Sequence, residues 1–472
     1  MTKFFLTTAI PYVNGRPHIG HTLEYFQADT VRRYHQLLGE DTLLLSGADE
    51  NALKNVQAAE KEGLPIQEYL DKYSKIWEKT YDLVGVKLDV FQRGSDQKKH
   101  WPGVQKFWDL CNKNGDIYKK TYTGLYCIGC EAFKTEGELE NGLCPIHQKA
   151  PEKVSEENYF FKLSMYQQKL IELIESDTLK IIPQNKRAEA LSFIKQGLED
   201  FNISRSRERA RGVGVPIPGD PNQFMYVWFD ALNIYMTGIG YGWDEKNWQK
   251  WWPADLHIIG KDINRFHTIY WPAMLLSAGL PLPKQILIHG FVNAKGGEKF
   301  SKSLGNAPDP KEVIEKYGLE AIRYYMLSQV PIQDDHDFTF EQFEEVVNAN
   351  LANGLGNLVA RVAKLCEQNN IEVRFNALNH FNKEVTKTLS EYKFNEALSF
   401  IWSLIAESDK LVNEKKPWEL SGDEAKEVLQ DLVSRIQQIA FNLQPFLPEI
   451  SERILKQFSG KVKSAPPLFP RI

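Results

Sequence analysis

The order of elements in the first sixty residues constrains the fold of this chain more than any other feature of its sequence. Residues 3–10 (KFFLTTAI) are rich in β-branched and aromatic side chains, which is typical of a buried strand. A loop with Pro11 and Pro17 follows, and residues 18–38 have the apolar spacing of an amphipathic helix. Residues 41–46 (DTLLLS) predict a second strand. Strand, loop, helix and strand in this order begin a doubly wound α/β fold with a parallel sheet.

The strand and helix pattern is interrupted in the middle of the chain. Between about residues 115 and 222 the sequence has clustered cysteines and short aromatic strands, which indicates an insertion between two halves of the α/β domain. The α/β pattern resumes after this segment, and the chain becomes helical from about residue 341. Apolar residues there recur every three or four positions, as in Leu351, Leu355, Leu358, Val362 and Leu365. A C-terminal α-helical bundle is therefore expected.

Charge and cysteine content exclude several classes of protein. The chain has 472 residues and a formal net charge of −5, so it is no basic protein that wraps nucleic acid, although a local basic surface is enough to bind RNA. Five cysteines in so long a chain make no disulfide framework, which fits a reducing compartment. The sequence has neither a long apolar run nor a signal-peptide cleavage site. We expect a cytoplasmic protein that is not bound to a membrane.

The tetrapeptide His18-Ile19-Gly20-His21 directly follows the first predicted strand. Two imidazoles three residues apart on the first turn of a helix lie on one face, and a helix N-terminus favours an anion. Gly20 permits a ligand to approach the backbone closely. By itself this motif is equally consistent with two surface histidines.

A second motif, Lys299-Phe300-Ser301-Lys302-Ser303, lies in the loop NAKGGEKFSKSLGN. Two lysines and two hydroxyls on a loop can clamp a polyphosphate and release it afterwards. A solvated lysine loop is the simpler interpretation of this segment alone. The histidine and lysine motifs together, in one interrupted α/β fold, are far more specific, and they predict that both bind the same nucleotide triphosphate.

The third motif has the spacing of a metal site. Cys127-x-x-Cys130 is followed by Cys144-x-x-His147. Three thiolates and one imidazole suit a tetrahedral zinc ion, and four protein ligands make the site structural rather than catalytic. The alternative is a set of buried free cysteines with an incidental histidine. Cys111 and Cys366 lie outside the cluster and are expected to be core residues.

The first two motifs resemble the signatures of the class I aminoacyl-tRNA synthetases, His-Ile-Gly-His and Lys-Met-Ser-Lys-Ser, with Phe300 in place of methionine. Nearly the whole chain is similar to the methionyl-tRNA synthetase family. The similarity rests on the stretches TTAIPYVNGRPHIGH, GDIYKKTYTGLYCIGCEAF, NYFFKLSMYQ, YVWFDALNIYMT, HIIGKDINRFHTIYWPAMLLSAG and PLFPRI. The chain departs from the family at Asn51 and Ala52, which are commonly histidine and glycine, and at Leu232, which is often smaller or proline.

The resemblance implies a ligase that forms methionyl-adenylate from methionine and ATP with Mg²⁺, and then transfers methionine to tRNA(Met), including the initiator tRNA. The catalytic residues that it implies are His18, His21, Lys299 and Lys302. The ATP-binding residues are Tyr12, His18, Gly20, His21, Lys302 and Ser303. The methionine-binding residues are Ala9, Ile10, Tyr12, Asp49, Trp228, Ala231, Tyr235, Ile263 and His267. Arg205 is a further candidate cation, although Arg207, Arg209 and Arg211 beside it are as readily a solvated run.

The methionine pocket so implied makes chemical sense. A thioether is polarizable, and aromatic faces suit it. A purely apolar slot rejects leucine weakly, so a hydrogen-bond donor near the sulfur, such as the Tyr12 hydroxyl or His267, would improve selectivity.

In the helical region, Asn357 and Arg361 lie one helical turn apart, and Trp418 follows Lys416-Pro417. In the family such residues bind the anticodon, through stacking of the tryptophan on an unpaired base and polar contacts to base edges. Without the resemblance, a capping asparagine, a surface arginine and a packed tryptophan would explain these residues.

The expected organisation is a Rossmann-like catalytic domain with an inserted zinc-knuckle connective domain and a C-terminal helical bundle. The predicted segments are 1–114 (first half of the catalytic domain), 115–222 (insertion with the zinc knuckle), 223–290 (second half), 291–345 (lysine loop and stem-contact region) and 346–472 (anticodon-binding bundle). We expect one structural Zn²⁺ per chain, Mg²⁺ with ATP, and a monomer, because the sequence ends without a further domain.

Three alternatives remain open at the level of sequence. A synthetase for leucine, isoleucine or valine is disfavoured because no large editing insertion is present, and one for cysteine because the metal ligands lie in the insertion. A small-molecule adenylyltransferase leaves the helical bundle without a role. A non-catalytic RNA-binding relative is disfavoured by the intact His18, His21 and Lys302.

Overall fold

The computed structural model describes residues 2–128, 132–300, 305–373 and 380–472. The chain divides into two compact units. The first contains Met1–Pro17, Asp41–Leu83 and Lys87–Ile288, and the second contains His18–Glu40, Val84–Val86 and His289–Ile472.

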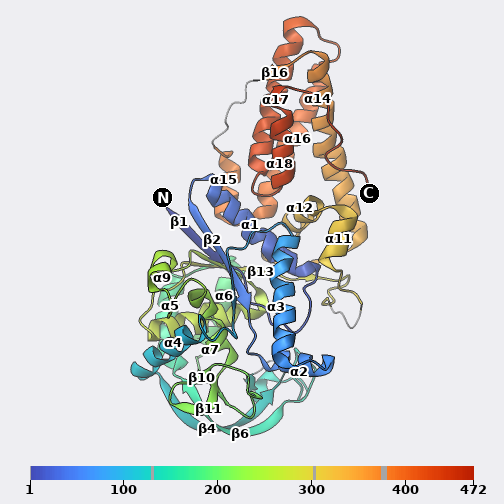
Figure 1. The fold of residues 1–472 in the computed structure, drawn as a ribbon. Helices are drawn as coiled ribbons and strands as arrows, with labels where there is room; N and C mark the ends of the chain where they lie inside the picture. Colours follow the sequence, from blue (N-terminus) through green and yellow to red (C-terminus); the bar gives the residue numbers. More distant parts are fainter. Residues whose placement is uncertain (1, 129–131, 301–304, 374–379) are drawn as a thin grey trace. The chain divides into compact units, whose positions relative to one another are not determined.

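A six-stranded sheet in the order β3-β2-β1-β12-β13-β7 forms the centre of the first unit (Figure 1). Its strands are β1 (Lys3–Thr7), β2 (Asp41–Ala48), β3 (Val90–Arg93), β7 (Lys180–Ile182), β12 (Leu256–Gly260) and β13 (Gln285–His289). The pairs β3–β2, β2–β1, β1–β12 and β13–β7 are parallel, which confirms the predicted α/β class. From the centre, β1 is followed outward by β2 and β3, and β12 is followed in the opposite direction by β13, so the carboxyl ends of β1 and β12 form a topological switch point, where such sheets bind ligands.

Helices pack on this sheet through a continuous core of aromatic and aliphatic side chains. They are α4 (Trp101–Lys113), α7 (Val227–Ala231), α8 (Ile234–Thr237), α9 (Glu245–Trp251), the π-helical turn η5 (Phe266–Tyr270) and α10 (Trp271–Ser277). Helices α2 (Leu53–Glu62) and α3 (Ile66–Leu83) lie between β2 and β3 in the sequence. The fully buried Trp271, Phe107 and Phe229 lie at the centre of this core.

The inserted region is antiparallel. One sheet has the order β5-β4-β6-β8, with β4 (Ile117–Cys127), β5 (Ala132–Lys134), β6 (Glu152–Phe161) and β8 (Phe201–Asn202). A second has the order β10-β11-β9, with β9 (Ser204–Ser206), β10 (Pro216–Ile217) and β11 (Asp220–Met225). Helices α5 (Gln167–Glu175) and α6 (Gln184–Lys195) flank β7 in the sequence. Because β7 pairs with β13, this region also supplies an edge strand to the central sheet.

The second unit begins with a 3-10 turn, η1 (Ile19–His21), and α1 (Thr22–Leu37). Its later elements are β14 (Val292–Asn293), α11 (Pro310–Tyr317), α12 (Leu319–Gln329), β15 (His336–Asp337), α13 (Phe340–Val346), η7 (Val347–Gly356), α14 (Asn357–Gln368), β16 (Glu372–Val373), α15 (Lys383–Ser390), α16 (Phe394–Lys415), α17 (Gly422–Leu443), α18 (Pro448–Gln457) and β17 (Gly460–Lys461). Helices α14, α16, α17 and α18 run side by side (Figure 1). The predicted apolar series from Leu351 to Leu365 is buried, although residues 347–356 are π-helical rather than α-helical. Among the described residues, no helix has the length and apolar character to span a membrane.

A buried ion pair joins α1 to the later helices of this unit. Arg323 and Asp29 are 1% and 2% exposed, and Arg323 Nη1 lies 2.8 Å from Asp29 Oδ2. The guanidinium also donates to the carbonyls of Phe446 at 2.9 Å and Pro445 at 3.3 Å, in the connection between α17 and α18. These bonds compensate the removal of the arginine charge from water.

Candidate active site

In the second unit, the turn His18-Ile19-Gly20-His21 holds its two imidazoles together. His18 is the N-cap of η1, and its Nδ1 accepts the Gly20 N–H at 3.2 Å. The His18 N–H in turn donates to His21 Nδ1 at 3.1 Å, and the two ring centroids are 3.9 Å apart. Because His18 Nδ1 accepts a backbone proton, the neutral His18 ring carries its proton on Nε2. His21 Nδ1 also lies 3.3 Å from His18 O, so the turn holds both rings through their Nδ1 atoms.

Phe300, in the described part of the lysine motif, lies against this turn. The Phe300 ring centroid is 5.3 Å from that of His18, and the Ile19 N–H donates to Pro308 O at 3.0 Å. Gly20 suits this contact, because an added Cβ would lie 3.3 Å from Phe300 Cδ2 and 3.1 Å from the His18 ring, and one of these side chains would have to shift. The histidine motif and the start of the lysine motif, far apart in the sequence, are thus adjacent in space.

Of the two predicted lysines, Lys299 is exposed, and its Nζ lies 5.6 Å from the Phe291 ring centroid. Asn306 Nδ2 donates to Lys299 O at 3.4 Å. The predicted Lys302 and Ser303 lie outside the described residues.

In the first unit, aromatic rings surround the crevice at the ends of β1 and β12. Trp228 stacks on Phe266 with a centroid distance of 3.9 Å and an interplanar angle of 7°. Tyr12 meets Trp228 edge-on at 6.3 Å, and His267 meets the same ring edge-on at 6.3 Å. The predicted Ala9 and Ile10 directly follow β1, and Ile263 follows β12 in the same way, whereas Ala231 is buried at the end of α7. This wall of flat apolar faces can hold a small apolar or thioether side chain.

His267 lies in η5 and is fully enclosed. Its Nδ1 lies 3.0 Å from Ile263 O, and its Nε2 lies 2.7 Å from the Tyr235 hydroxyl. A carbonyl only accepts, so Nδ1 is the donor and Nε2 accepts the tyrosine proton. Burial lowers the pKa of His267 to about 4, against the weaker opposing effect of its bond to Ile263, so the ring is neutral at physiological pH. His267 therefore orients Tyr235 and, in this arrangement, directs no proton of its own toward the crevice.

Asp49 follows β2 and is 2% exposed. Its N–H donates to Pro11 O at 3.0 Å, and Asn55 Nδ2 donates to Asp49 O at 2.8 Å. Asp49 forms a β-bridge with Tyr12. These bonds fix the backbone of Asp49 beside Tyr12 in the aromatic wall.

A buried polar network behind the wall was not predicted from the sequence. Asp230 Oδ1 lies 2.6 Å from His100 Nε2, and His100 Nδ1 lies 2.7 Å from the Thr237 hydroxyl. Asn51 Nδ2 donates to Asp230 Oδ2 at 2.6 Å and to Gly94 O at 2.9 Å, so a residue that departs from the family bridges two segments. No local pattern could reveal a pair separated by 130 positions. Only the position of Asp230 beside Trp228 was a signal.

The described members of the metal motif lie together. Cys127 Sγ and Cys144 Sγ are 3.9 Å and 3.7 Å from His147 Nδ1, and the three ligand atoms lie within 4.8 Å of one another. Zinc bonds of about 2.3 Å to sulfur and about 2.0 Å to nitrogen give tetrahedral edges of about 3.6–3.8 Å, so this geometry fits the ion. Cys130, the fourth predicted ligand, lies outside the described residues.

The three residues predicted to bind an anticodon lie in the second unit. The Arg361 guanidinium lies 4.9 Å from the Trp418 ring centroid, and its Nη1 donates to Asn413 Oδ1 at 2.8 Å. Trp418 is 49% exposed, which is unusual for so large an apolar side chain, and Asn357 is exposed at the start of α14. An exposed indole beside a cation is a suitable platform for an unpaired base.

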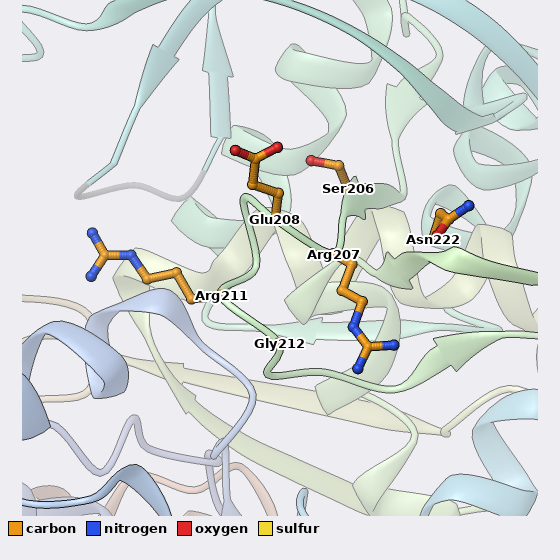
Figure 2. A pocket seen from close by; sticks show the side chains of 6 residues that line it. All are labelled: Ser206, Arg207, Glu208, Arg211, Gly212 and Asn222. Atoms are coloured by element: carbon orange, nitrogen blue, oxygen red, sulfur yellow. The ribbon is translucent and has the colours of Figure 1, made fainter.

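The arginines in and after β9 do not form a single cation site. Arg205 is buried, and its guanidinium lies 5.1 Å from the ring centroids of both Tyr126 and Tyr226. Arg207 and Arg211 line a shallow hollow of about 600 Å³ together with Ser206, Glu208, Gly212 and Asn222. Figure 2 shows that the two guanidinium groups point in different directions from the turn, and Arg211 pairs with Glu60 at 2.5 Å. These side chains converge on no common ligand.

Comparison with known proteins agrees with this geometry. The family described as tRNA synthetases class I (M) matches residues 4–150 and 134–363. The methionine–tRNA ligase of Thermotoga maritima is 37% identical over 98% of this chain and 76% of its own length, and that of Clostridium acetobutylicum is 39% identical over 100% and 78%. The structure of Mycobacterium tuberculosis methionyl-tRNA synthetase in complex with methionyl-adenylate superposes with a TM-score of 0.90, at 32% identity, over 100% of both chains.

Proposed function

This chain belongs to the methionine class of the class I tRNA synthetases, and we propose that it is a methionine–tRNA ligase. The observation that carries the proposal beyond family membership is the contact between Phe300 and His18. It brings the histidine motif and the start of the lysine motif together in one unit, and imidazoles with lysines suit a triphosphate.

The aromatic crevice of the first unit binds methionine in this proposal. The stacked Trp228 and Phe266 offer flat faces to the thioether, and Asp49 binds the ammonium group. Tyr235, held by His267, closes the slot with a fixed hydroxyl. Ala9, Ile10, Tyr12, Ala231 and Ile263 complete the lining.

The second unit binds ATP. His18 and His21 donate from Nε2 to phosphate oxygens, and Lys299, with the predicted Lys302 and Ser303, neutralises the charge that develops on pyrophosphate. Mg²⁺ bound with ATP supplies further neutralisation of the phosphate charge. The methionine carboxylate attacks the α-phosphate in line, its bond to phosphorus forms, and pyrophosphate leaves. The nucleophile is already ionised at neutral pH, so positioning replaces general base catalysis.

The second step transfers methionine to the 2′-hydroxyl of the 3′-terminal adenosine of tRNA(Met), and AMP leaves. Trp418 and Arg361 bind the anticodon of elongator and initiator tRNA, with Asn357 on the same helix. Exposure of the apolar indole to water is unfavourable in the free protein. Stacking on a base removes the face of the ring from water and so favours binding.

Zinc held by Cys127, Cys130, Cys144 and His147 has a structural role in this proposal. The spacing of the three described ligand atoms supports it, since it already matches a tetrahedral site. Metal analysis is expected to find one zinc ion per chain, and Cys144→Ser to lose it. A Cys144→Ser protein that keeps one zinc ion would contradict this ligand set.

The remaining expectations stand as proposals on the same basis. They are a cytoplasmic monomer and a division into segments 1–114, 115–222, 223–290, 291–345 and 346–472. Sedimentation of the purified chain, with and without tRNA, tests the monomer.

Methionine-dependent exchange of pyrophosphate into ATP tests the whole proposal. With each of the twenty amino acids offered in turn, methionine is expected to give the highest rate. Exchange driven mainly by another amino acid would refute the specificity, and no exchange with any would refute the ligase.

A further inference from the structure

The turn that precedes Lys299 is held by a carboxylate from another segment. Residues 294–298 form a tight turn closed by the Ala294 N–H, which donates to Glu298 O at 2.7 Å. Gly296 and Gly297 at its tip have φ values of 81° and 75°, which glycine adopts without strain. Gly296 N donates to Asp337 Oδ2 at 2.8 Å, and Gly297 N donates to Oδ2 at 3.1 Å and Oδ1 at 3.2 Å. Two successive backbone amides thus enclose one carboxylate, as in an anion-binding nest.

The position of Asp337 is itself fixed by strand pairing. β14 and β15 pair in parallel, with Asn293 opposite Asp337, and the Phe338 N–H donates to Asn293 O at 2.8 Å. Asp335 Oδ1 accepts the Phe291 N–H at 3.0 Å. The segment 335–337 therefore fastens the chain both before β14 and at the tip of the turn.

We propose that Asp337 is a positioning residue for adenylate formation, because its carboxylate sets the direction in which Lys299 and Phe300 leave the turn. The inference rests on the proposed role of Lys299 at the triphosphate. Phe300 lies three residues after Gly297 and contacts the His18 ring, so a tilt of the turn displaces Lys299 and this contact together. A charged acceptor holds backbone amides more strongly than a neutral one, which is why a carboxylate suits this position.

The main test compares Asp337→Ala with a matched control, Asp334→Ala. Asp334 is exposed, and its carboxylate makes no hydrogen bond or ion pair in the part of the chain that the structure describes. For Asp337→Ala we expect kcat of methionine-dependent exchange to fall about 10- to 100-fold with KM for methionine unchanged, because small displacements of positioning groups cost that much. The control is expected to match the wild type.

The second half-reaction separates positioning from a general structural role. Transfer of methionine from preformed methionyl-adenylate to tRNA no longer involves pyrophosphate, so Asp337→Ala is expected to leave its single-turnover rate unchanged. An equal loss in both half-reactions, or equal exchange rates for Asp337→Ala and Asp334→Ala, would overturn the inference. Absence of methionine-dependent exchange in the wild-type protein would instead overturn the proposed function. The wild type is therefore measured before any variant.

A variant of Gly297, on the other side of the contact with Asp337, tests the proposal independently if Asp337→Ala misfolds. An alanine Cβ at position 297 has open space around it, but the positive φ of that residue disfavours any side chain. Gly297→Ala is expected to reshape the turn and lower exchange without affecting transfer. If both residues act through one contact, the double variant is expected to lose less than the product of the two single effects. Gly297→Ala with wild-type exchange would count against the proposal.

Discussion

Around the crevice at the ends of β1 and β12, burial fixes the side chains, whereas around His18 and Lys299 backbone hydrogen bonds fix side chains that are partly or fully exposed. Tyr235 and His267 are 0% and 1% exposed and have few alternative positions. His18 is held by the Gly20 N–H, and the turn before Lys299 is held by Asp337. The first region is suited to select an apolar side chain by shape, and the second to meet a flexible, highly charged group. Substitutions in the first should change KM for methionine, and those in the second should change kcat.

The strongest test of this separation is His18→Ala. Removing one donor that stabilises developing charge typically costs about 100- to 1,000-fold in kcat, and we expect a loss of that size in pyrophosphate exchange. KM for methionine is expected to stay unchanged. His35→Ala is the control, because His35 lies in the last turn of α1, away from the histidine turn, and pairs with Glu40. A rise in KM for methionine as large as the fall in kcat would break the comparison.

Trp418→Ala extends the test to a third region. Loss of base stacking is worth about 1–3 kcal/mol, so KM for tRNA is expected to rise about 30-fold. Exchange, which needs no tRNA, is expected to be unaffected. Trp418→Phe retains an aromatic face and should recover part of the loss, whereas equal defects in both variants would argue against stacking.

The pH dependence of stability sharpens the description of the first region. Burial lowers the pKa of His267 to about 4, from an ordinary value near 6.5. At a pH between these two values, His267 binds a proton in the unfolded chain but not in the folded chain. The stability associated with neutral His267 is therefore fully present above pH 6.5 and is lost as pH falls toward 4. Between pH 7 and 5 the wild type should lose about 2 kcal/mol more than His267→Gln. Urea unfolding at both pH values measures the free energy of unfolding of each protein. An equal loss of stability in the wild type and in His267→Gln would contradict the lowered pKa of His267.

The smallest expected effect comes from Tyr235→Phe, which removes one hydroxyl. A hydrogen bond contributes about 1 kcal/mol, and His267 Nε2 is also left without its donor, so KM for methionine is expected to rise about 10-fold with kcat nearly unchanged. Tyr241→Phe is a matched control. Its hydroxyl is also buried but makes no hydrogen bond among the described residues. An equal rise in KM for methionine in the two variants would show that loss of any buried hydroxyl produces this effect.

The structural features that depend on neighbours in the chain could be predicted from the sequence. The apolar spacing predicted the first strands and the bundle, and residues 18–21 formed a turn with both imidazoles together as expected. Features that depend on partners distant in the sequence could not be predicted in this way. The proton of Tyr235 is directed by a histidine 32 positions away, and Asp337 accepts from glycines 40 and 41 positions away.

The role expected for His267 shows the same limit. As a single residue near a thioether, it is a reasonable hydrogen-bond donor. Its Nδ1 is occupied by Ile263 O and its Nε2 by Tyr235, and these contacts arise from a π-helical turn that periodicity does not signal. Propensity and spacing cannot show which ring nitrogen has a partner, because that depends on packing in three dimensions.

The Arg323–Asp29 pair has a consequence for dissecting the chain into fragments. α1 begins directly after His21, and its Asp29 neutralises a guanidinium that also needs the carbonyls of Pro445 and Phe446. A truncation before residue 445 would leave a buried charge without two of its acceptors, a defect that costs several kcal/mol. Fragments that retain the histidine turn but end before residue 445 should therefore be insoluble or protease-sensitive, and shortened versions of this protein must keep the chain through Phe446.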